Sequence, residues 1–221
     1  MMLVSAALLL GIWLTGVAAA QPAPEPLELA RRIQARFDTV RDFSADFTHA
    51  YEGGVLRRRV TERGTVLMKK PGRMRWTYAS PERKLFVADG ERLWAYVPED
   101  RQVTVAPMSP GDDAGAAALL FAGRGNLLRD YTVSAADLPA RPADTWAIKI
   151  VPRREQADYE WAILVVGRKD LGLRMVVTAD SQGGQSTFSF TNVRENTGVP
   201  DRQFTFEVPR GVDVISSGRG Q

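Results

Sequence analysis

Hydrophobic and polar residues alternate with a period of two along most of the chain after residue 42. The stretch RMRWTY at 73–78 places its Met, Trp and Tyr on one side and its two Arg and Thr on the other, as in a strand with one buried face. The same alternation recurs at Trp94 and Tyr96; Trp146, Ile148 and Ile150; Leu173, Met175 and Val177; Phe188 and Phe190; and Phe204, Phe206 and Val208. The pattern predicts a large sheet with one apolar face, although a two-sheet sandwich would show it too.

Turn signals separate the predicted strands about every ten residues. They are Gly53-Gly54, Pro71-Gly72, Asp89-Gly90, Pro98-Glu99-Asp100, Leu171-Gly172 and Gln182-Gly183-Gly184. Asp-Gly between two alternating runs is a strong signal for a two-residue hairpin. The order of strands and turns therefore indicates an antiparallel meander, which could be open or closed.

One segment near the start follows the helical period instead. Within residues 26–40, Leu29, Ile33, Phe37 and Val40 recur at steps of three and four, while the arginines fall elsewhere. The segment begins with proline, which suits a first helical turn. We expect one amphipathic helix that packs its apolar side on the sheet.

A second, shorter helix is expected between strands, at residues 115–123. This segment reads GAAALLFAG, so it is apolar and bounded by glycines. It could be a small core helix, or it could cover the apolar face of a curved sheet as a lid.

The first twenty residues form a separate unit in the sequence. Residues 3–17 are almost wholly apolar and are followed by three alanines, as in a secretory signal peptide, although the first ten residues lack a basic one. An uncleaved anchor would need roughly 20 apolar residues. We therefore expect a cleaved signal peptide at 1–20 and a single domain at 21–221.

Charge and cysteine content narrow the possible partners. The formal net charge is +3, and an exported chain with so mild an excess is not expected to bind nucleic acid. Cysteine is absent from the sequence, which leaves neither disulfides nor a lipidated cysteine. The expected location is the periplasm, with the fold held by core packing alone.

The sequence contains little that points to catalysis. His49 is its single histidine, and the zinc-protease, serine-hydrolase and phosphate-loop motifs are all missing. Asp112 and Asp113 stand next to each other in a Pro/Gly-rich stretch, where solvated turn residues are the usual interpretation. We expect no enzyme, no metal and no cofactor.

Basic residues are concentrated between residues 57 and 75. They are Arg57, Arg58, Arg59, Arg63, Lys69, Lys70, Arg73 and Arg75. Such charges commonly protect a sheet edge from mispairing. They could equally form a docking surface for an acidic partner or for anionic lipid head groups, and the pattern leaves both open.

The central and C-terminal motifs resemble those of the periplasmic outer-membrane lipoprotein carrier family, LolA. The matching residues are Lys69-Lys70-Pro71, Arg75-Trp76-Thr77-Tyr78, Pro81, Asp89-Gly90, Leu93-Trp94-Ala95-Tyr96, Gln203-Phe204-Thr205-Phe206 and Val208-Pro209-Arg210-Gly211-Val212. The resemblance implies a mainly β fold with some α: an incomplete, unclosed antiparallel β-barrel with helices as a lid over an apolar cavity.

The resemblance also implies a function and partners. Members accept lipoproteins released from the inner membrane by an ABC complex, LolCDE, shield their acyl chains, and deliver them to an outer-membrane acceptor, LolB. A monomer is expected. The candidates for lining the cavity are Met74, Trp76, Tyr78, Phe86, Trp94 and Phe121.

Lys70 stands where the family usually has an arginine that holds the lid closed. An ammonium is a compact charge on a flexible stem, so we expect a lid held more loosely than is typical. Two other functions stay open: a related lipid-binding sensor of the cell envelope that regulates a membrane partner, and a periplasmic hydrolase.

Overall fold

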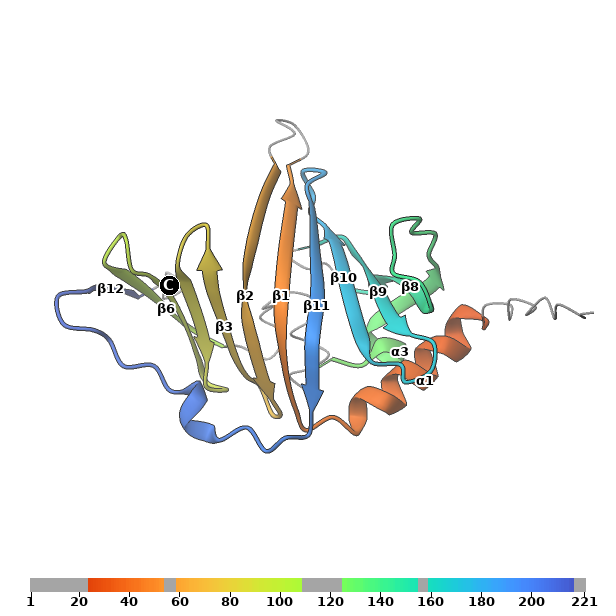
Figure 1. The fold of residues 1–221 in the computed structure, drawn as a ribbon, viewed down its shortest axis with the longest axis horizontal. Helices are drawn as coiled ribbons and strands as arrows, with labels where there is room; N and C mark the ends of the chain where they lie inside the picture. The colour runs from red at the N-terminus through yellow and green to blue at the C-terminus, as the bar shows by residue number, and fades with distance from the viewer. Residues whose placement is uncertain (1–23, 54–58, 109–124, 155–158, 217–221) are drawn as a thin grey trace, which may run out of the picture.

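The computed structural model describes residues 24–53, 59–108, 125–154 and 159–216. The predicted signal peptide, the helix predicted at 115–123 with Phe121, the pair Asp112 and Asp113, and the basic residues Arg57 and Arg58 lie outside these ranges. Figure 1 shows a single broad sheet of long, curving strands, with the α-helices gathered at one side of it.

The chain begins with a helix and continues almost entirely as strands. The elements are α1 (Pro26–Asp38), β1 (Asp42–Glu52), β2 (Arg59–Lys69), β3 (Arg73–Ser80), β4 (Lys84–Ala88), β5 (Arg92–Val97), β6 (Gln102–Pro107), α3 (Leu127–Asp130), β7 (Tyr131–Ala135), β8 (Thr145–Pro152), β9 (Trp161–Gly167), β10 (Leu173–Ala179), β11 (Gln185–Glu195), the 3-10 helix η1 (Asp201–Phe204) and β12 (Asp213–Ser216). The predicted turns that lie within the described residues all fall between these elements, and Gly54 of the first one lies outside them.

All the strands belong to one sheet, in the order β12-β6-β5-β4-β3-β2-β1-β11-β10-β9-β8-β7. Neighbouring strands are antiparallel, apart from β12, which pairs with β6 in parallel. The two edges, β12 and β7, do not pair with each other, so the strongly curved sheet is unclosed. This confirms the incomplete barrel expected from the resemblance.

Helix α1 confirms the predicted amphipathic helix. Pro26 lies in its first turn, and Leu29, Ile33 and Phe37 are buried on one side. The helix packs mainly against α3, β7 and β8. No helix within the described ranges is both long and apolar enough to span a membrane.

The face of the sheet that packs against α1 is called the inner face here, and the opposite one the outer face. The inner face carries the main core, which extends from α1 across the sheet as far as β5. Its fully buried sheet residues include Phe43, Met68, Ile148, Ile150, Leu164 and Leu173.

The alternation of Leu173, Met175 and Val177 does not keep all three on one face. A register shift between Leu173 and Met175 interrupts the pairing of β10 with β9. Leu173 therefore belongs to the main core, while Met175 and Val177 join a small outer cluster with Ile163 and Val165. A bulge adds one residue and so reverses the faces beyond it.

The strand predicted at Phe204, Phe206 and Val208 is wrong. The chain forms η1 at Asp201–Phe204 and then continues without pairing to β12. Prolines at 200 and 209 flank this segment, and a proline has no N–H to donate to a ladder. The segment lies across the outer face instead, where Phe204 is buried, at 1% exposure, and Phe206 is half-buried.

Candidate functional site

Aromatic rings gather on the inner face over β11, β1, β3 and β4. The ring centroid of Phe47 lies 4.9 Å from that of Trp76 and 4.8 Å from that of Tyr78, both nearly edge to face. Phe188 lies 5.5 Å from Trp76, and Phe86 lies 5.7 Å from Tyr78. Edge-to-face packing is a favoured geometry for aromatic pairs. These five residues form the aromatic cluster.

A glycine on β2 makes room for the centre of the cluster. Gly64 pairs with Phe47 on one side and with Tyr78 on the other. A Cβ atom at this position would collide with the Thr77 carbonyl oxygen and with the Phe47 ring. The missing side chain therefore lets the two rings meet over the strand between them.

Four of the six predicted lining residues come together on the inner face. Met74 and Trp76 are buried, at 3% and 7% exposure, and Tyr78 and Phe86 are half-buried beside them. Phe121 lies outside the described residues. The half-buried pair gives this face an apolar surface that the rest of the described chain does not cover completely.

Trp94 is not brought together with the other candidates. Phe86 pairs with Ala95, so the neighbouring Trp94 points to the outer face. There its ring lies 6.3 Å from Phe206 of the C-terminal segment. Trp94 lies between Leu93 and Ala95, so the residue pattern of this strand does not show which of its faces turns inward, and register decides it.

A polar network borders the aromatic cluster on the same face. His49 Nδ1 lies 3.0 Å from Glu62 Oε2, and His49 Nε2 lies 3.1 Å from Ser186 Oγ. Lys84 Nζ donates to Glu62 Oε1 at 2.8 Å. The His49 ring stacks on Phe188, with centroids 4.1 Å apart. His49, Glu62, Lys84 and Ser186 form this polar network.

The protonation states within the network follow from its contacts. Burial lowers the pKa of His49, although Glu62 opposes this. Burial also acts to raise the pKa of Glu62, but hydrogen bonds from Lys84 and His49 outweigh it and lower that pKa. His49 is thus neutral at pH 7, with Nδ1–H donating to Glu62 and Nε2 accepting from the Ser186 hydroxyl.

Sequence reasoning singled out His49 but missed Glu62, Lys84 and Ser186. The available signal was a polar residue at an inward position of an alternating strand. Glu62 shares its face with Val66 and Met68, and His49 shares its face with Phe47. Buried polar groups of this kind require partners, which here come from other strands.

The order Ser186, His49, Glu62 has the connectivity of a serine-hydrolase triad. Such enzymes also need donors aimed at the developing oxyanion. Ser186 lies within a paired strand, in register with Tyr51 and Thr178, so the backbone N–H groups around it form the hydrogen bonds of the sheet and are not aimed at an oxyanion.

Among the described residues there is also no group of three His, Cys, Asp or Glu side chains that could hold a metal.

Lys70 contacts the end of α1. Its Nζ donates to the backbone carbonyl oxygen of Phe37 at 2.6 Å. Burial lowers the pKa of Lys70, and the nearby Asp38 opposes this. The Phe37 carbonyl oxygen also accepts from the Val40 N–H at 3.1 Å, and the end of a helix carries a partial negative charge, so an ammonium is favourable at this position.

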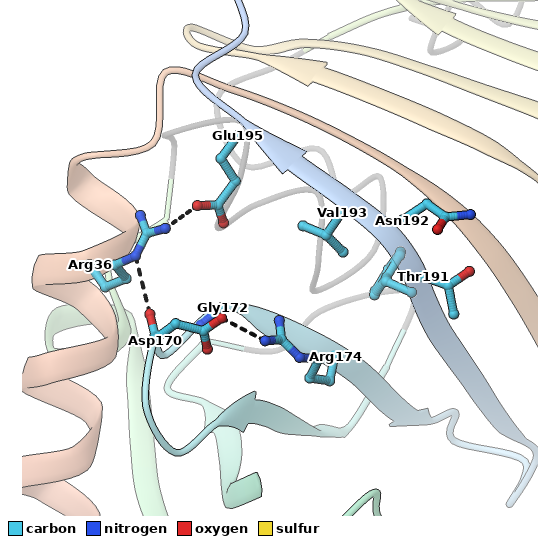
Figure 2. A pocket seen from close by; sticks show the side chains of 9 residues that line it. Arg36, Asp170, Gly172, Arg174, Thr191, Asn192, Val193 and Glu195 are labelled. Atoms are coloured by element: carbon cyan, nitrogen blue, oxygen red, sulfur yellow. Dashed lines mark hydrogen bonds and ion pairs between the residues drawn. The ribbon is translucent and has the colours of Figure 1, made fainter. Parts of the chain in front are cut away.

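Arg36 makes a second connection at the same end of α1 (Figure 2). Its guanidinium forms an ion pair with Glu195 of β11, and its Nε donates to the Asp170 carbonyl oxygen at 3.3 Å. Asp170 in turn pairs with Arg174 at 2.6 Å. These residues border a pocket of about 440 Å³ between β10 and β11. The last turn of α1 is therefore attached to the sheet at two points.

Three residues of the described part of the basic cluster, Lys69, Arg73 and Arg75, bind the chain's own C-terminal segment, while Arg59 pairs with Glu52. Lys69 Nζ donates to the Val199 carbonyl oxygen at 2.7 Å and pairs with Asp201 at 2.6 Å, and Arg73 also pairs with Asp201, at 2.9 Å. Arg75 donates to the Gln203 carbonyl oxygen at 3.1 Å. Asp201 of the same chain thus forms ion pairs with two of these basic residues on the outer face.

Comparisons with known proteins agree with this architecture. The family model for the outer membrane lipoprotein carrier protein LolA matches residues 38–207. The outer-membrane lipoprotein carrier protein of Nitrosospira multiformis is 30% identical over 191 residues, which are 86% of this chain and 84% of that protein. Its counterpart in Chromohalobacter salexigens is 28% identical over 190 residues, covering 86% and 87%.

Among solved structures, an uncharacterized conserved protein from Thermus thermophilus aligns with a TM-score of 0.52. The alignment covers 86% of this chain and 98% of that one at 12% identity, so it supports the fold alone. The family model spans most of the chain and includes the aromatic cluster, the polar network and Lys70. The chain belongs to the LolA family of outer membrane lipoprotein carrier proteins.

Proposed function

We propose that this chain is a periplasmic carrier of lipid-anchored proteins. It would accept them when the inner-membrane ABC complex LolCDE releases them, shield their acyl chains, and deliver them to an outer-membrane acceptor such as LolB. Curated relatives carry the name outer-membrane lipoprotein carrier protein. The chain would act as a monomer, without a cofactor and without catalysis.

The observation that carries this proposal is the half-buried aromatic surface of the inner face. Tyr78 and Phe86 lie beside the buried Trp76 and Met74, on the face that also packs against α1. Aromatic and methionine side chains offer large apolar contact area, and methionine adapts its shape to irregular partners. Such a surface suits disordered acyl chains better than one rigid ligand.

The free energy of acyl burial explains why a carrier is needed. At ~0.8 kcal/mol per methylene, moving an anchor with two chains of ~15 methylenes into water would cost more than roughly 20 kcal/mol of free energy. This matches the tightest non-covalent complexes known, so free release would be impractically slow. The cargo must pass by direct contact, and the carrier needs an affinity only slightly below that of its acceptor.

We propose that α1 belongs to the lid and that Lys70 holds it. The bond from Lys70 Nζ to the Phe37 carbonyl oxygen joins the β2–β3 turn to the last turn of the helix. A lysine makes such a bond with one flexible point charge, whereas an arginine can donate several in a fixed geometry. This supports a lid that opens at modest cost.

A release assay tests the proposal directly. Purified protein from Gln21 to Gln221 is added to spheroplasts that lack their own carrier, and the supernatant is tested for lipid-anchored proteins bound to it. Soluble complexes are the expected result. Absence of release, with the ABC complex shown to be active toward a known carrier, would contradict the proposal. Lipid binding without release would favour the envelope sensor instead.

A further inference from the structure

Two hydrogen-bond donors on the inner face stand where the aromatic cluster meets the polar network. Tyr78 and Lys84 lie directly opposite each other on β3 and β4. Lys84 extends across β3 to reach Glu62 on β2. The Tyr78 ring is packed edge to face against both Phe47 and Phe86, which fixes its direction. The hydroxyl and the ammonium therefore belong to one small region of the face.

The half-buried Tyr78 side chain has a hydroxyl that makes no hydrogen bond to any part of the chain that the structure describes. Burial, followed by the charge of Glu62, raises the pKa of Tyr78, so the hydroxyl keeps its proton. Lys84 has three protons and two carboxylate partners, Glu62 at 2.8 Å and Glu82 at 3.3 Å. Each residue thus retains a donor for a ligand.

The charges around these donors limit what the ligand can be. Glu62 and Glu82 contribute −2, Lys84 contributes +1 and the neutral His49 contributes nothing, so the local charge is −1. A phosphate or a free carboxylate would be repelled by this field. A neutral acceptor oxygen would not. The adjoining aromatic rings provide a surface for an alkyl chain attached to that oxygen.

We propose that Tyr78 and Lys84 bind the ester or amide carbonyl oxygen at the head of an acyl chain whose alkyl part lies on the aromatic cluster. This inference rests on the proposed function and assigns its ligand a polar end. Glu62 and His49 act as positioning residues, because they hold Lys84 over β3. Ser186 fixes the orientation of the His49 ring.

The test compares two ligands that differ only at the carbonyl. One is a synthetic lipopeptide with two ester-linked chains, and the other is its analogue with ether linkages and the same chain lengths. Affinities are measured on the chain from Gln21 by competition with a fluorescent fatty-acid probe. One neutral hydrogen bond is worth ~1 kcal/mol, so wild type should prefer the ester about fivefold.

Substitutions show which residues cause the preference for the ester ligand. Tyr78→Phe keeps the ring and removes only the hydroxyl, so it should clearly reduce the preference for the ester. Lys84→Met would leave Glu62 with an unbalanced charge, and it is therefore combined with Glu62→Gln; this pair should also reduce the preference. The matched control is Tyr96→Phe on the outer face, near Phe206, which should keep it.

Each outcome separates the proposals. Equal affinity of wild type for the two ligands, or a preference that Tyr78→Phe leaves unchanged, overturns this inference and leaves the carrier function standing. Failure of wild type to bind either ligand removes the carrier function as well. Hydrolysis of the ester by wild type that is lost in Ser186→Ala would show a catalytic site in place of a carbonyl-binding one.

Discussion

The inner face has two halves that differ in composition and in how completely they are covered. Over β8, β9 and β10 it is mainly aliphatic, apart from Trp146 on β8, and Ile150, Leu164 and Leu173 have no measurable exposure. Over β3 and β4 it is aromatic, and Tyr78 and Phe86 remain half-buried. Helix α1 packs mainly on the first of these halves, through β7 and β8.

The contrast suggests that one half of the sheet mainly stabilises the fold and the other half mainly binds lipid. Branched aliphatic side chains pack densely under a helix and leave little surface for a ligand. Aromatic side chains with open edges retain apolar area that a second molecule can cover. Substitutions in the aliphatic half should therefore change mainly the free energy of unfolding, and substitutions in the aromatic half mainly the affinity for lipid.

The largest effect is expected for Leu164→Ala in the aliphatic half. The change leaves a cavity in the main core and should lower the free energy of unfolding by about 3 kcal/mol. Urea denaturation followed by circular dichroism measures it. Lipid affinity of the folded fraction should stay close to wild type. A loss below about 1 kcal/mol would show that this half is not the main core.

Phe86→Ala should produce the opposite pattern in the aromatic half. Removal of a half-buried ring should weaken lipid binding about tenfold, because contact area for the alkyl chain is lost, and should cost only about 1 kcal/mol of stability. Leu85→Ala, on the outer face of the same strand, is the matched control. Equal losses of lipid affinity in both variants would contradict a binding role specific to the inner face.

Lys70→Arg should sharpen the comparison at the helix that covers the aliphatic half. A guanidinium can donate to more than one carbonyl group at the end of α1, so the lid should open less readily. One added hydrogen bond predicts lipid transfer to an acceptor about fivefold slower. Lys69→Arg, whose side chain faces the outer surface and Asp201, is the control. Unchanged transfer kinetics in Lys70→Arg would refute the role of Lys70.

The smallest effect is expected from the titration of His49. Burial lowers its folded-state pKa below the ordinary 6.5, so the unfolded chain takes up a proton first as the pH falls. Wild type should lose stability between pH 6.5 and its lower folded pKa, and the loss should be complete below that value. Denaturation at several pH values, relative to His49→Gln, isolates this contribution. Parallel profiles for the two proteins would mean that the pKa is not shifted.

Much of the fold could be predicted because it depends on local pattern. The helix at Pro26–Asp38 follows from apolar residues at steps of three and four, and the Asp89-Gly90 hairpin from its turn residues. The aromatic face of β3 follows from the alternation of Met74, Trp76 and Tyr78. These signals act within one element, so neighbouring strands were not needed to interpret them.

The placement of residues across strands was decided only in the tertiary structure. Trp94 is a large aromatic residue of a predicted strand, as Trp76 is, yet the register of β4 and β5 turns it outward against Phe206. The sequence pattern of the C-terminal aromatic run predicted a strand. In the structure the run lies across the outer face, where Lys69 and Arg73 form ion pairs with Asp201.

The sequence by itself determined a helix, a long series of strands and the aromatic composition of one face, because the spacing of apolar residues sets helix and strand locally. The polar network was decided by the tertiary structure alone. His49, Glu62, Lys84 and Ser186 come from four strands and are separated by up to 137 residues along the chain. Their contacts exist only once those strands pair in one register, which no local pattern specifies.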